Sequence, residues 1–189
     1  MMRQESIISD GLFYILTTAG KLKIKVIDDY VWMESAAPYI VKTINEADSL
    51  ELYKAYGLIS SDAHPQLKPM AVSSGLTDIM LPVASKDALM KAIQDKQEVI
   101  SLSRKHNVVG VHMFALGKES GVTAYCSNFA PLYGIDEECA TGTSNASLTY
   151  YLFYHGLLEK DKENIFIQGE HIGKKAEIRS ILLNNKGES

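Results

Sequence analysis

The stretch of the chain with the clearest capacity for chemistry is GIDEECATGTSNASLTYYLFYHG, residues 134–156. Three acids, Asp136, Glu137 and Glu138, stand directly before a run of small residues at 140–144. A carboxylate can accept a hydrogen bond from a substrate or transfer a proton. Small residues that open a helix leave its first N–H groups accessible, and these groups favour an anion together with the helix dipole. The pattern therefore predicts a place where a carboxylate-bearing substrate meets an acid–base group.

An apolar helix is expected to follow, over residues 146–158. Its apolar residues occupy all sides rather than one stripe, which is typical of a helix buried in a core, and Gly156 is expected to end or loosen it. Thr143 and Ser144 can cap its start or bind a ligand. A purely structural interpretation stays open, because small residues at a helix start often form only a tight turn and nearby acids often only stabilise the dipole.

The composition excludes several classes of protein. A chain of 189 residues with 46% hydrophobic content can form one sizeable domain or two small ones. The net charge of −4 argues against a nucleic-acid partner. The sequence has no apolar run long enough to span a bilayer, and MMRQESIISDG lacks the apolar segment of a secretory signal. Cys126 and Cys139 form no disulfide framework, and the five histidines show no paired ligand spacing. We therefore expect a cytoplasmic protein without a metal or a membrane partner.

The elements that must position the acids are mostly short strands. Branched and aromatic residues interrupted by turn residues predict strands, and helical spacing of apolar residues predicts helices. Asp48 or Ser49 can cap the helix expected over residues 47–58. The expected strands cover residues 12–18, 21–27, 30–36, the segments on both sides of 73–75, 108–116, 121–129, 162–170 and 174–183, and the other expected helices cover 47–58 and, as a short pair, 86–107. The chain is therefore expected to be a mixed α+β fold with one apolar helix late in the sequence.

At this point the motifs resemble a known family. GIDEECATGTSNASLTYYL resembles the G-I-x-E-D-P-A-T-G-S-A signature of the PhzF-like phenazine-biosynthesis family, of the diaminopimelate-epimerase-like superfamily. Three further stretches, VSSGLTDIMLPVASKDAL, NFAPLYGI and IQGEHIGKKAEI, occur in the family's order, so that the resemblance extends from about Gly11 to Leu183. It implies an α+β lobe in which a mostly antiparallel, β-barrel-like sheet wraps around one central apolar helix. A single lobe over residues 1–189 is expected, with loose ends at 1–10 and 184–189.

The resemblance also implies an activity and a set of site residues. The activity is cofactor-independent isomerisation or epimerisation by proton transfer on a small carboxylate-bearing metabolite. At the matching positions, Glu138 and Thr143 are expected to be catalytic. The expected substrate-binding residues are Gly142, Thr141, Glu137 and Gly75.

Some positions depart from the family pattern. Cys139 replaces its proline, Ser127 lies near the position of an arginine, and Lys174 replaces the arginine of a Gly-Arg pair. Lysine does not reproduce the two-pronged anion contact of arginine, so the family's model substrate is not carried over. Superfamily epimerases use a cysteine pair as acid and base, so catalysis by Cys139 is an alternative hypothesis. Their thiol aligns with Thr141, however, which argues against this alternative. His171 is a further candidate because it follows the IQGE segment.

The matching segments correspond to the second of the family's two lobes. The first lobe supplies an acid–base glutamate in an E-T-x-F-like stretch and a G-H-x-T-like helix start, and this sequence contains neither. We therefore expect the cleft to be completed in a homodimer or by a separate chain that carries the missing lobe. The alternative is a non-catalytic remnant or a binding module that takes a partner or a small anion.

Overall fold

The chain divides into two compact units. The computed structural model describes residues 9–17, 20–27, 30–118 and 121–184. The units are Met1–Ala36 and Ala37–Ser189. The single lobe over residues 1–189 stays a prediction, and most of the ends expected to be loose, 1–8 and 185–189, lie outside the described residues.

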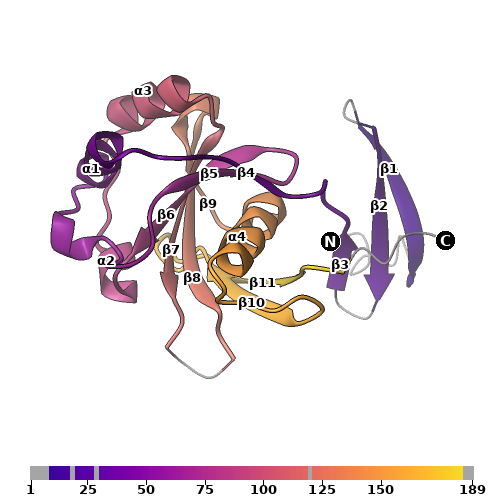
Figure 1. Ribbon diagram of the computed structural model, residues 1–189. Helices are drawn as coiled ribbons and strands as arrows, with labels where there is room; N and C mark the ends of the chain where they lie inside the picture. Colours follow the sequence, from indigo (N-terminus) through magenta and orange to yellow (C-terminus); the bar gives the residue numbers. More distant parts are fainter. Residues whose placement is uncertain (1–8, 18–19, 28–29, 119–120, 185–189) are drawn as a thin grey trace. The chain divides into compact units, whose positions relative to one another are not determined.

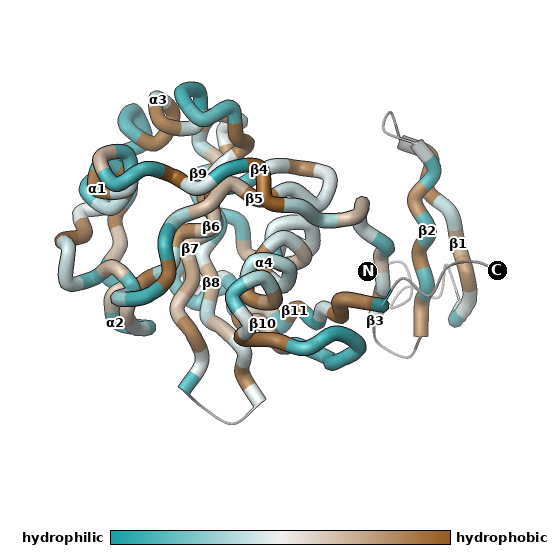
Figure 2. The backbone as a smooth tube through the Cα atoms, viewed as in Figure 1, coloured by the Kyte–Doolittle hydropathy of each residue, from teal (hydrophilic) through white to brown (hydrophobic). Residues whose placement is uncertain are grey.

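The first unit contains a three-stranded antiparallel sheet in the order β1-β2-β3. Its strands are β1 (Gly11–Thr17), β2 (Gly20–Ile27) and β3 (Tyr30–Met33). Phe13 lies opposite Ile24, which lies opposite Met33, and the neighbouring Lys25 therefore belongs to the other face. Figure 2 shows the resulting alternation of hydrophobic and hydrophilic residues along β2. The three predicted strands are confirmed.

The second unit is built on an eight-stranded sheet in the order β11-β10-β8-β7-β6-β5-β4, with β9 paired to β8. The strands are β4 (Tyr39–Thr43), β5 (Met70–Ser73), β6 (Thr77–Val83), β7 (Gly110–Leu116), β8 (Ala124–Ala130), β9 (Ile135–Glu138), β10 (Glu163–Gln168) and β11 (Ala176–Ile181). The pairs β6–β7 and β8–β10 are parallel and the other pairs are antiparallel. The mixed α+β class is confirmed, although the sheet of the described residues stays open and does not close into a barrel. Strands β4 and β9 were not predicted from the sequence.

Helices cover both faces of this sheet (Figure 1). One face packs against α1 (Glu46–Ala55), α2 (Lys86–Met90) and α3 (Lys96–His106), and the other packs against α4 (Gly142–Tyr154). Two short 3₁₀ turns cover Ser60–Asp62 and Pro131–Tyr133. The predicted cap of α1 is wrong, because the side chain of Asn45 accepts the hydrogen bond from the backbone N–H of Asp48.

Alternate strand residues fill two separate cores. Ile79 and Leu81 of β6 pack towards α1, α2 and α3, whereas Met80 packs towards α4 together with Phe114 of β7. This alternation follows from the two-residue period of a strand. The strands at the centre of the sheet are buried on both faces, which explains their nearly continuous apolar sequence.

The helix that follows the acids differs from its prediction in two respects. It begins at Gly142, four residues before the predicted start at 146, because Thr141 is the last residue with an extended backbone. It ends at Tyr154, and Gly156 with φ 70° follows, as expected for a helix end. The prediction of a helix buried on all sides is wrong at Tyr154, which is 58% exposed.

Candidate functional site

A row of polar side chains crosses the α4 face of the sheet and ends at Glu138. Glu138 of β9 lies opposite Asn128 of β8, which lies opposite His112 of β7, so the three side chains share one face. Nδ1 of His112 lies 3.0 Å from Oδ1 of Asn128. Burial lowers the pKa of His112 to about 4, so its ring is neutral near pH 7. Strand β9 therefore fixes Glu138 beside a buried, uncharged polar layer.

The two adjacent glutamates point to opposite sides of β9. Consecutive strand residues face opposite ways, and the contacts of Glu137 and Glu138 agree with this rule. Oε2 of Glu138 accepts from Thr141, whereas Oε2 of Glu137 lies 2.6 Å from Nδ1 of His171. The Glu137 side chain is only 5% exposed. The structure thus brings His171 to Glu137 and separates this pair from the start of α4.

A chain of hydrogen bonds holds the Glu138 carboxylate. Nδ2 of Asn145 donates to Oε1 of Gln168 at 2.8 Å, and Nε2 of Gln168 donates to Oγ1 of Thr141 at 3.0 Å. The Thr141 hydroxyl donates in turn to Oε2 of Glu138 at 2.9 Å. Thr141 stands at the N-cap position of α4, but its side chain does not cap the helix. It instead links the helix start to the carboxylate.

The other predicted residues meet at the first turn of α4. Gly142 is exposed and Thr143 is half-buried. The turn after β5 reaches this point, because the Ser74 hydroxyl donates to the backbone carbonyl of Thr143 at 2.8 Å and accepts from Ser147 at 3.1 Å. Gly75 follows Ser74, is exposed and has φ 121°. The structure therefore brings the turn that contains Gly75 to the first turn of α4, which holds Gly142 and Thr143 and follows Thr141.

Sequence reasoning missed three polar residues of this region, Asp78, Asn145 and Gln168. Ser144 donates to Oδ2 of Asp78 at 2.6 Å, and burial raises the pKa of this Asp78 carboxyl. Asn145 and Gln168 are fully buried and were not selected. Their only sequence signal is a polar residue inside an apolar segment, such as Gln168 at the end of ENIFIQ. Such a signal does not show which side chains will meet.

The cysteines occupy different environments, and both are free. Cys126 is buried in the core below α4, and burial raises the pKa of its thiol. Cys139 lies between β9 and α4 and is half-buried. Within the described ranges, no cluster of three or more His, Cys, Asp or Glu side chains could hold a metal ion. No helix in that part of the chain is long and apolar enough to cross a membrane.

An open hollow on the surface lies apart from the predicted site residues. It has a volume of about 380 Å³ and is lined by Lys86, Met90, Glu170, Gly173 and Lys175. Nζ of Lys86 lies 2.7 Å from Oε2 of Glu170, so opposite charges line it. None of the predicted site residues belongs to its lining. The start of α4 therefore does not line this hollow.

Comparison with known proteins supports the resemblance seen in the sequence. Residues 3–188 match the sequence model of the PhzC-PhzF family, described as phenazine biosynthesis-like protein. An uncharacterized isomerase of Deinococcus radiodurans is 29% identical over 172 residues, which cover 86% of this chain and 54% of that protein. An uncharacterized isomerase of Clostridium acetobutylicum is 32% identical over 171 residues, which cover 85% of this chain and 56% of that protein.

Solved structures share the fold. A PhzF-family phenazine biosynthesis protein of Bacillus anthracis superposes with a TM-score of 0.81 at 21% identity, over 94% of this chain and 62% of that chain. A predicted epimerase of Pseudomonas aeruginosa superposes with a TM-score of 0.73 at 18% identity, over 97% of this chain and 64% of that chain. The chain spans little more than half the length of the curated relatives it matches. Since the family's sequence model covers residues 3–188, the chain belongs to the phenazine biosynthesis-like PhzC-PhzF family.

Proposed function

We propose that this chain forms one wall of the active site of a cofactor-independent isomerase or epimerase. The observation that carries the proposal is the fixed Glu138 carboxylate beside the first turn of α4. Only its Oε2 atom is engaged, and Oε1 receives no hydrogen bond from the described residues. A half-buried carboxylate with one free oxygen is suited to take a proton from carbon and to return it. The names of the relatives, two isomerases and a predicted epimerase, support the same reaction class.

The proposed substrate is a small metabolite with a carboxylate group. The backbone N–H groups of Gly142 and Thr143 belong to the first turn of α4, where the helix dipole favours an anion. A carboxylate bound there places its neighbouring carbon within reach of Glu138. The Thr143 hydroxyl and Gly75 border the same place and limit the size of the substrate. Glu137 lies on the other side of β9, so its proposed part is to fix the strand through His171.

A second wall is required for turnover. Isomerisation by proton transfer needs a donor and an acceptor placed at the reacting carbon. The matched part covers 54% and 56% of two curated relatives, so these relatives contain further residues that can supply the second group. We propose that a second copy of this chain or a separate chain supplies it here, in the cytoplasm.

Exchange of substrate hydrogen with solvent tests the proposal. The purified chain is incubated in deuterium oxide with small amino and hydroxy carboxylic acids, and deuterium incorporation is followed by mass spectrometry. Light scattering on the same sample gives the assembly state. Deuterium incorporation by a dimer supports the proposal. A dimer that binds a carboxylate without incorporating deuterium contradicts it and favours a binding module. A monomer without exchange calls for the same assay after mixing with a chain that carries the remaining part of a relative, and an inactive mixture contradicts the proposal.

A further inference from the structure

The hydrogen bonds between α4, β10 and β9 run in one direction. Nδ2 of Asn145 donates both to the backbone carbonyl of Thr141 at 2.9 Å and to Oε1 of Gln168 at 2.8 Å. These bonds assign the oxygen of the Gln168 amide to the side of Asn145. Its nitrogen must then face the other way, where it donates to the backbone carbonyl of Glu138 at 2.7 Å and to Oγ1 of Thr141 at 3.0 Å.

This direction decides where the Thr141 hydroxyl points. A threonine hydroxyl has one hydrogen to donate. Because its oxygen already accepts from Gln168, that hydrogen is free to be donated to Oε2 of Glu138 at 2.9 Å. Gln168 is fully buried, so water does not compete for its amide. The same amide therefore fixes the backbone of Glu138 and, through Thr141, its carboxylate.

The local backbone allows β10 to approach this closely. Gly169 directly follows Gln168 and has φ 79°, a conformation that favours glycine. A Cβ at this position would collide with the carbonyl oxygen of Lys174 and would lie 2.9 Å from the carbonyl oxygen of Cys139. Glycine at 169 thus permits the contact of β10 with the connection between β9 and α4.

We propose that Gln168 is a positioning residue that holds the Glu138 carboxylate, through Thr141, in the orientation needed for proton transfer. The statement that this orientation serves proton transfer rests on the proposed function. The orientation itself does not require a substrate and can be tested on the full chain alone.

Carboxyl labelling with a carbodiimide and glycine ethyl ester measures how firmly each carboxylate is held. The test variant is Gln168→Glu, which keeps the shape and the Oε1 acceptor but replaces the donor by an acceptor. The new carboxylate then competes with Glu138 for the single hydrogen of Thr141. The extent of labelling at Glu138 is expected to rise about fivefold, with no rise at Glu159.

The matched control is Asn164→Asp, the same chemical change on the same strand. Asn164 is 4% exposed and bonds to the backbone carbonyls of Lys162 and Ser180, away from Glu138. The Asn164→Asp variant should therefore leave the labelling of Glu138 unchanged. If Gln168→Glu unfolds the chain, Thr141→Val replaces it: Thr141→Val should raise labelling at Glu138, and Thr141→Ser should restore it.

Labelling of Glu138 that is equal in the wild type and in Gln168→Glu, or in Thr141→Val where that variant replaces it, overturns the positioning of the carboxylate. Where the wild type exchanges deuterium, Gln168→Glu should lower kcat and leave KM unchanged, and a change confined to KM would also contradict the inference. If labelling responds as expected while no assembly of the wild-type chain exchanges deuterium, the positioning stands and the proposed function fails. The two failures are therefore distinguishable.

Discussion

At its central strands the large sheet is buried on both faces, but different side chains lie on each face. The face below α1, α2 and α3 is a continuous apolar core that includes Leu81, Val111 and Met113. The face below α4 combines a smaller apolar core with His112 and Asn128, both buried. Apolar packing can be exchanged among many residues, whereas a buried polar group needs particular partners. The contrast agrees with the proposal that the first face mainly stabilises the fold and that the second positions the proposed acid–base group.

The largest effect on stability is expected from the apolar face. Leu81 is fully buried there, so Leu81→Ala should lower the free energy of unfolding by about 2–5 kcal/mol through lost burial and a cavity. Urea unfolding measures this change. Carboxyl labelling of Glu138 in the folded variant should match the wild type. A rise in labelling at Glu138 alone would show that the two faces do not act independently.

The polar face should make stability depend on pH. Burial lowers the pKa of His112 to about 4 from its ordinary value of 6.5. Below pH 6.5 the unfolded chain binds a proton that the folded chain does not bind, so stability falls as the pH decreases and this loss levels off below about pH 4. The full contribution is about 3 kcal/mol.

Replacement by a group that does not titrate isolates this contribution. His112→Gln should flatten the decline in unfolding free energy between pH 6.5 and 4 by this amount, as measured by urea unfolding across the range. An equal decline in the wild type and the variant would show that His112 is not the group concerned.

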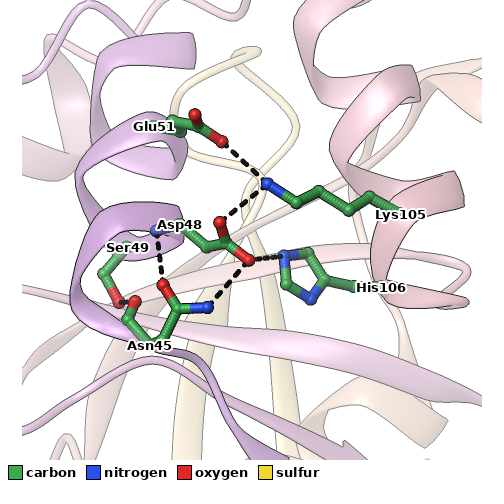
Figure 3. A network of polar contacts seen from close by, with 6 residues as sticks. All are labelled: Asn45, Asp48, Ser49, Glu51, Lys105 and His106. Carbon is green, nitrogen blue, oxygen red and sulfur yellow. Dashed lines mark hydrogen bonds and ion pairs between the residues drawn. The ribbon is translucent and has the colours of Figure 1, made fainter.

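The smallest effect is expected from the charged network between α1 and α3 (Figure 3). Nζ of Lys105 on α3 lies 2.7 Å from Oδ1 of Asp48 and 3.1 Å from Oε2 of Glu51 on α1. The bond from Lys105 lowers the pKa of Asp48, so this contribution is present above the ordinary pKa of the carboxyl and is lost as the pH falls through the lowered value.

The Lys105 side chain is 49% exposed, so solvent screens its charge, and Lys105→Ala should lower the melting temperature by no more than about 3 °C at pH 7, and by less in high salt. Differential scanning calorimetry at two salt concentrations provides the measurement. A large, salt-independent drop would show that the helical layer also depends on specific polar partners.

The sequence predicted the periodic elements well and the polar contacts poorly. Strands such as β2 and helices such as α3 carry their period in adjacent residues. Strand β9 was missed because IDEE contains three acids, and its pairing with β8 depends on residues elsewhere in the chain. The start of α4 was placed too late because the rule used was apolar content, whereas Ser144 and Asn145 bury polar groups in its first turn.

The candidate site shows the same limit. The stretch around Glu138 was selected from its residue types and from the family signature. The sequence did not show that Glu137 faces the other side of β9, because the element itself was not expected. Nor did it show that Gln168, which lies 27 residues after Thr141, completes the hydrogen bonds. Contacts between distant segments depend on the register of β8, β9 and β10, which local patterns do not determine.

The most direct test of the account compares the wild type with Glu138→Gln in the complete assembly, by deuterium incorporation into the substrate. The amide keeps the size of the side chain and the acceptor for Thr141 but cannot take a proton. The account predicts a loss of exchange of at least about a hundredfold with little change in melting temperature, while the control Glu159→Gln, an exposed acid after α4, exchanges normally. Exchange that persists in Glu138→Gln at the wild-type rate would contradict the assignment of Glu138 and with it the central claim about the α4 face.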